Sequence, residues 1–216
     1  MNLLRPALCL LLALSSLPAF ALSDGGQEKL HALQQRWAEI NYQTPAEARE
    51  KAFASLSEQA DAAVKAEPKA AELLIWRGII LSTYAGAKGG LGALGLVKEA
   101  KASLEQALAL DAKALEGSAY TSLGSLYYQV PGWPVGFGDN DKAAAMLKQA
   151  LAINPKGIDP NYFQADFLYR NGRYDEASTA LNKALEAAPR PGREVADAGR
   201  RSDIATLQQK IAAEQD

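Results

Sequence analysis

The stretch NYFQADFLYRNGRYDEASTALNKALEAAP, residues 161–189, decides the fold. Its first half carries aromatic and leucine side chains, and an Asn-Gly pair at 171–172 follows as a turn signal. Its second half places Ala177, Leu181 and Ala184 at helical spacing before Pro189. Small and large apolar residues that alternate on one helix face let a second helix approach closely. The stretch therefore predicts a pair of helices joined by a tight turn.

The same alternation of alanine and leucine recurs upstream, which predicts a repeat. The equivalent alanines of the successive copies, Ala63, Ala107, Ala150 and Ala184, lie 44, 43 and 34 residues apart. Repeats of this size build a solenoid in which each helix pair packs on its neighbours. The excess over 34 residues predicts insertions between the helices of two copies, at residues 85–95 and 130–139. Equivalent turns of a solenoid share one edge, so the two loops should be neighbours.

Two sets of residues resemble the tetratricopeptide repeat. Its first-helix positions are matched by Tyr120, Leu123, Gly124 and Tyr127, and its second-helix positions by Ala143, Leu147, Ala150 and Pro155. The resemblance is strongest in the last two copies and weakest in the first. It implies an all-α fold: a right-handed α-solenoid of about four tetratricopeptide-like helix pairs over residues 22–189. Residues 190–216 are expected to form a linker and a C-terminal capping helix.

The N-terminus reads as a secretory signal peptide over residues 1–21. A positive charge at Arg5 precedes a short apolar run, and the triplet Ala19, Phe20, Ala21 suits cleavage near Ala21. The run is shorter than the roughly 20 residues of a membrane-spanning helix. We therefore expect an exported, periplasmic protein without stable membrane insertion. Cys9, the only cysteine, lies within this segment, so we expect no disulfide.

Composition and motifs argue against catalysis and against several ligand classes. The formal net charge of −2 in 216 residues argues against a nucleic-acid partner. His31 is the sole histidine, and no nucleophile triad or isolated carboxylate pair stands out, so we predict no metal site and no enzyme activity. Asp139 suits a helix N-cap better than a calcium loop. The glycines at 90, 92 and 95 match a dinucleotide motif without a β-α-β context, so no cofactor is expected.

Aromatic residues supply the candidate partner-binding positions. Trp133 and Phe137 lie in the inserted loop at 130–139, where Pro131 and Pro134 stiffen the chain. Two interpretations stay open for this pair: a plug of the protein's own core, or an anchor for a partner. The repeat resemblance also implies a concave groove that holds a peptide, and it assigns to that groove the residues Tyr128, Tyr162, Asp166 and Tyr169.

Four arginines form the densest basic group, namely Arg190, Arg193, Arg200 and Arg201. Pairing with nearby acidic residues explains them most simply. The alternative is a fork-like contact with the carboxylate or phosphate of an anionic ligand.

A second, local resemblance bears on partners. Gly138, Asp139, Lys142 and Ala143, after the inserted loop, are similar to the T-component proteins of TRAP-type solute transporters, which implies work beside a periplasmic substrate-binding protein. We therefore predict a non-enzymatic, exported scaffold or adaptor. It would bind a cell-envelope protein or peptide, such as a transporter-associated substrate-binding protein, through the concave groove and the aromatic loop. A small-ligand carrier whose pocket is closed by the 130–139 loop and a self-assembling homo-oligomer stay as alternatives.

Overall fold

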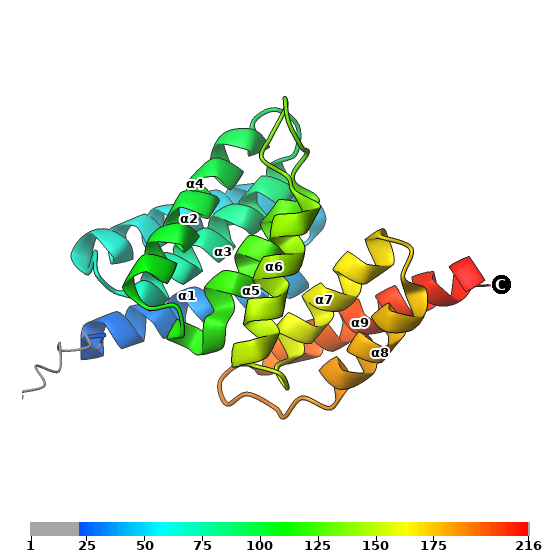
Figure 1. Ribbon diagram of the computed structural model, residues 1–216. Coiled ribbons are helices and arrows are strands. Elements are labelled where there is room, and N and C mark those ends of the chain that lie inside the picture. The colour runs from blue at the N-terminus through cyan, green and yellow to red at the C-terminus, as the bar shows by residue number, and fades with distance from the viewer. Residues whose placement is uncertain (1–21, 216) are drawn as a thin grey trace, which may run out of the picture.

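The computed structural model describes residues 22–215, so the predicted signal peptide lies outside the described residues. Within that range the chain folds into nine helices without a strand (Figure 1). In chain order they are α1 (Asp24–Gln43), α2 (Ala46–Ala66), α3 (Ala71–Lys88), α4 (Ala93–Leu110), α5 (Ala114–Gln129), α6 (Asn140–Ile153), α7 (Ile158–Arg170), α8 (Tyr174–Leu185) and α9 (Glu194–Gln215). The predicted all-α fold of about four helix pairs and a C-terminal helix is confirmed.

Glycines set the spacing within two helix pairs. A side-chain carbon added to Gly78 of α3 would lie 2.5 Å from the Leu104 side chain of α4, and one added to Gly124 of α5 would lie 2.8 Å from Leu147 of α6. Leu104 and Leu147 are themselves fully buried. Each leucine therefore fills the space that the missing side chain leaves, and the two helices of a pair approach more closely than larger residues would permit.

The two predicted insertions take different forms. The sequence predicts the first over residues 85–95, but α3 continues to Lys88 and α4 begins at Ala93, so only residues 89–92 are irregular. Most of the added residues therefore lengthen the two helices instead of forming a loop. The second insertion is a true loop between α5 and α6. Both connections emerge at the same end of the stack (Figure 1), and the side chain of Lys101 on α4 lies over the ring of Phe137 in the second loop.

Helix α9 does more than cap the last pair. Its C-terminal part packs Ile204, Leu207 and Ile211 against α7 and α8, as a capping helix should. Its N-terminal part instead returns to the start of the stack, where Val195 and Ala196 join the core formed by α1, α2 and α3. The helix thus connects the last pair to the first. The sequence predicts only a lid over the last apolar face, and the additional contact with α1 is a finding of the tertiary structure.

Candidate functional site

The loop between α5 and α6 is a short hairpin, and hydrogen bonds at its base hold it in place. The backbone N–H of Gly138 donates to the carbonyl of Pro131 at 2.9 Å, and the N–H of Asp139 donates to the carbonyl of Tyr127 at 2.8 Å. The Asp139 side chain then caps α6 by accepting from the N–H of Lys142 at 3.0 Å. The helix-capping interpretation of Asp139 is confirmed by this bond. These contacts position the loop relative to both helices.

Glycine is required where the two arms of the hairpin meet. A side chain on Gly138 would overlap the carbonyl of Val130, and one on Gly136 would overlap the carbonyl of Pro131. The glycines that exclude a continuous helix here therefore allow a close backbone approach. The hairpin is consequently held by its backbone, and its tip side chains are left to point outward.

The two aromatic residues of the hairpin have opposite environments. Phe137 packs edge-on against Tyr127 with ring centroids 5.8 Å apart, and it is partly buried against the central core. Trp133 is 90% exposed, Val135 of the same loop is 55% exposed, and Leu91 of the α3–α4 connection is 85% exposed. We call Leu91, Trp133 and Val135 the loop edge. Phe137 therefore contributes to packing within the chain, whereas Trp133 is left exposed to solvent, and the anchor interpretation stays a prediction for Trp133.

The predicted groove residues make contacts within the chain. The hydroxyl of Tyr128 donates to Asp166 Oδ2 at 2.8 Å, and Nε of Arg170 donates to the same oxygen at 3.0 Å. Burial, together with the neighbouring Asp166 carboxylate, raises the pKa of Tyr128 well above its ordinary value. The ring of Tyr169 contacts that of Tyr174. These side chains have intramolecular partners, so an incoming ligand would have to compete with them.

Helix α9 and the linker before it each bring one of the four predicted arginines onto a single carboxylate. Arg190 donates to Asp159 Oδ2 at 2.7 Å and Arg200 donates to Asp159 Oδ1 at 2.8 Å. Burial by itself would raise the pKa of Asp159, but the charges of Arg200 and Arg190 outweigh it and lower the pKa to about 2. Arg200 also lies 4.3 Å from the ring centroid of Tyr162. The predicted groove residue Tyr162 is thus covered by α9.

Further bonds complete this polar contact between α9 and the rest of the stack. Arg190 also binds Asp197, whereas Arg200 also binds Asp203, whose Oδ2 accepts from the hydroxyl of Tyr42 on α1 at 3.0 Å. The sequence predicts that the arginines pair with nearby acidic residues, but it gives no sign of Tyr42 or Asp203 as members of this contact. Tyr42 and Asp203 lie 161 residues apart. No local pattern could have paired them.

The remaining two arginines differ from each other. Arg201 donates to the carbonyls of Leu185 and Ala187 near the end of α8, at 3.0 and 2.9 Å. The guanidinium of Arg193 instead lies 4.9 Å from the ring centroid of Trp76 on α3. Its Nε is buried without a hydrogen-bond partner.

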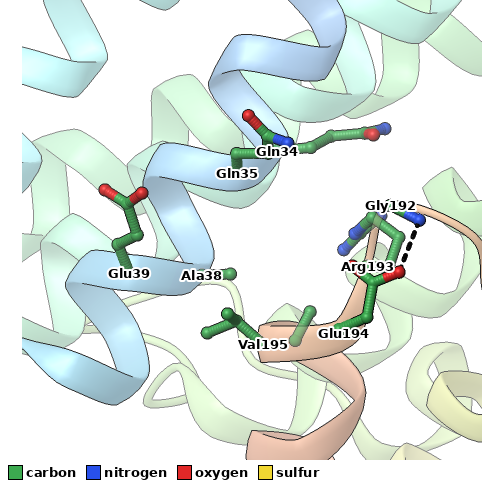
Figure 2. A pocket seen from close by; sticks show the side chains of 9 residues that line it. Gln34, Gln35, Ala38, Glu39, Gly192, Arg193, Glu194 and Val195 are labelled. Carbon is green, nitrogen blue, oxygen red and sulfur yellow. Dashed lines mark hydrogen bonds between the residues drawn. The ribbon is translucent and has the colours of Figure 1, made fainter.

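Arg193 lines a cleft of about 190 Å³ between α1 and the start of α9. Figure 2 shows α1 contributing one wall and the turn before α9 the other. The lining residues are Gln34, Gln35, Ala38, Glu39, Gly192, Arg193, Glu194, Val195 and Ala196. None of them belongs to the 130–139 loop, so the alternative of a pocket closed by that loop gains no support from this cleft.

Two further observations concern the part of the chain that the structure describes. Within residues 22–215, no three His, Cys, Asp or Glu side chains gather so that they could hold a metal ion. Over the same range, no helix combines the length and the apolar character that crossing a bilayer requires.

Comparison with known proteins gives one family match. The profile described as "Tetratricopeptide repeat" matches residues 135–201, which run from the hairpin through α6, α7 and α8 into α9. The chain is similar to TTC0263, a thermophilic TPR protein in Thermus thermophilus, with 21% identity, coverage of 84% of this chain and 98% of that chain, and a TM-score of 0.44. It is also similar to the MamA protein, with 20% identity, coverage of 87% and 93%, and a TM-score of 0.43. No curated protein matches the chain. Residues 135–201 of this chain accordingly match the tetratricopeptide-repeat family.

Proposed function

We propose that this protein is a non-enzymatic scaffold that binds a partner protein at the loop edge. The observation that carries the proposal is the exposure of Trp133, which is 90% accessible on a hairpin whose base is hydrogen-bonded in place. A large aromatic side chain on a preorganised loop loses little conformational entropy on binding, and tryptophan is enriched among residues that dominate interface energies. The tetratricopeptide repeat is in general a protein-interaction scaffold, which agrees with this role.

The loop edge is favoured over the concave groove as the contact surface. Helix α9 covers Tyr162, and Asp159 is bound by Arg200 of α9 and by Arg190 of the preceding linker. Tyr128 and Asp166 are bonded to each other. A partner that entered there would have to break these contacts, whereas Leu91, Trp133 and Val135 would lose only water.

The place of action and the partner class rest on the sequence. The signal-peptide pattern of residues 1–21 supports export to the periplasm. The local resemblance around Gly138 and Asp139 supports a cell-envelope partner, such as the substrate-binding protein of a TRAP-type transporter. We propose both on those grounds. A self-assembled oligomer would use the same exposed edge and is an outcome of the test below.

The test compares capture of envelope proteins by three forms of the purified protein: wild type, Trp133→Ala and Leu110→Ala. Leu110 is 45% exposed and lies at the far end of α4, so it provides a matched control for loss of an exposed apolar side chain. We expect a partner that wild type and Leu110→Ala retain and Trp133→Ala loses. Size-exclusion chromatography with light scattering identifies the oligomer outcome, in which Trp133→Ala lowers the mass of the particle.

Stability measurements separate recognition from packing. Trp133→Ala should change the free energy of unfolding by less than about 0.5 kcal/mol, because the side chain is exposed. Phe137→Ala should cost about 2 kcal/mol, because its ring packs on Tyr127. If Trp133→Ala destabilises the protein as much as Phe137→Ala and the partner is still captured, Trp133 is core and the proposal is wrong.

A further inference from the structure

We propose that the cleft between α1 and the start of α9 binds a small organic carboxylate through Arg193. The inference is separate from the proposed function, because the cleft shares no residue with the loop edge. It starts from a difference among the arginines. Of the nine arginines in residues 22–215, eight donate a hydrogen bond to a carboxylate or to a backbone carbonyl. Arg193 is the exception within that range, and its Nε is buried without a partner.

Two acidic groups act on the charge of Arg193 without accepting a hydrogen bond from it. Asp159 and Asp197 act on its charge from a distance, but their oxygens accept hydrogen bonds from Arg190 and Arg200. Burial, and then the neighbouring charge of Arg190, lower the pKa of Arg193. A guanidinium stays protonated under all ordinary conditions. The protein therefore holds a partly desolvated cation without a counter-charge at hydrogen-bonding distance, which is costly unless something binds it.

Trp76 fixes the orientation of the Arg193 guanidinium. The guanidinium lies 4.9 Å from the centroid of this buried indole, so a cation–π contact holds one side of it. An arginine held against an aromatic ring can still present the N–H groups at its edge to a planar acceptor. The arrangement is preorganised for a carboxylate, whose two oxygens match the arginine fork.

The other polar groups of the cleft suit the same ligand. Gln34 adds an amide that can donate to it, and Gln35 adds a second amide that already contacts His31 at 2.8 Å. The two acidic residues of the lining each have a partner, and that of Glu194 is the lining residue Gly192. Glu39 pairs with Arg36 at 2.8 Å, and Glu194 accepts from the backbone N–H of Gly192 at 3.0 Å.

The volume of the cleft limits the size of the ligand. The cleft of about 190 Å³ is smaller than the roughly 300–1,000 Å³ pockets of drug-sized ligands, so it suits a small molecule and not a folded partner. Ala38 and Val195 give one part of the cleft an apolar lining that would cover a short hydrocarbon segment. The carboxylate could belong to a free acid or to the C-terminus of a short peptide, and the test includes both sources.

The experiment titrates purified protein with propionate, with the dipeptide Ala-Ala, and with propionamide and amidated Ala-Ala as uncharged controls. Tryptophan fluorescence is followed in a Trp133→Phe background, because Trp76 contacts Arg193 whereas the exposed indole at 133 would only add signal. We expect a saturable change with at least one carboxylate and none with either amide. Saturation by Ala-Ala alone would assign the source to a peptide C-terminus, and saturation by propionate would assign it to a free acid.

Variants then test whether Arg193 carries the binding. Arg193→Met keeps the length of the side chain and removes its charge, and we expect it to weaken binding at least tenfold. Arg173→Met is the matched control, because Arg173 is an exposed arginine of the α7–α8 turn that pairs with Glu176. It should leave binding unchanged. Titration of the Nε–H signal of Arg193 by NMR provides a readout at the proposed contact itself.

Two binding results would overturn the inference. One is the absence of any saturable change with propionate and Ala-Ala through the millimolar range. The other is equal binding by wild type and Arg193→Met. Stability gives an independent check, because removal of an uncompensated charge should leave the free energy of unfolding unchanged or raised. A marked fall in this free energy in Arg193→Met would show that the cation–π contact is structural, and the inference would fail.

Discussion

The loop edge and the face between α7 and α9 reverse the usual distribution of side chains. At the loop edge, apolar groups are exposed: Trp133, Val135 and Leu91 meet water. Between α7 and α9, charged groups are buried: Arg200 and Asp197 are each 8% exposed. Exposing apolar side chains to water is unfavourable, and removing charged side chains from water is unfavourable as well. The charged face is closed by contacts within the chain, whereas the apolar edge stays exposed, and this difference is the basis of the partner site proposed above.

The closed face should depend on its charges more than on any exposed pair. In Arg200→Met, Asp159 and Asp203 each lose a hydrogen-bonded cation, and Tyr162 loses its cation–π contact. We expect the free energy of unfolding to fall by about 3–5 kcal/mol, because a buried charge is left incompletely paired. Urea unfolding measures this. The matched Arg173→Met, at an exposed ion pair, should cost less than about 1 kcal/mol. Equal losses in the two variants would show that the charged face contributes no special stability.

The space around a glycine also differs between the two regions. Gly199 of α9 faces the ring of Tyr42, and an added side-chain carbon would overlap that ring. Gly199→Ala should therefore destabilise the protein by about 1–3 kcal/mol despite the better helix propensity of alanine. Gly95, in α4 close to the loop edge, has open space around it. Gly95→Ala should stabilise by about 0.5–1 kcal/mol. Thermal unfolding of both variants decides whether the contact between α9 and α1 is as close as described, since a neutral Gly199→Ala would contradict it.

Acid should weaken the charged face before it affects the loop edge. The pKa of Asp159 is lowered from 3.8 to about 2 in the folded state. Its charge therefore stabilises the fold above the unfolded pKa, and this contribution disappears as pH falls from about 4 to 2. We expect a loss on the order of 1–2 kcal/mol, discounted for the solvent that still reaches the carboxylate. Denaturant unfolding at several pH values measures it, with Asp159→Asn as the comparison. If that variant shows the same slope over this range, other carboxylates are responsible.

Much of the fold was predictable because its cause is local. The spacing of Ala177, Leu181 and Ala184 marks the buried face of α8, and all three are buried. Pairs such as Gly124 and Leu147 place a gap opposite a large side chain, and both residues stand at repeat positions. The hairpin was predictable in outline, since proline and glycine exclude a continuous helix there. The separate environments of Trp133 and Phe137 were not predictable, because burial depends on which face the loop turns toward the stack.

The sequence by itself determined the helix pairs, their close spacing and the position of the inserted hairpin, because each follows from residues within a few turns of one another. Only the tertiary structure decided that α9 returns to α1, that Arg200 meets Asp159 and Asp203, and that Arg193 rests on Trp76 without an acceptor. Contacts between residues far apart in the chain produce no repeating pattern in the sequence. They arise when folded helices with complementary surfaces pack against one another, so the candidate carboxylate cleft was visible only in three dimensions.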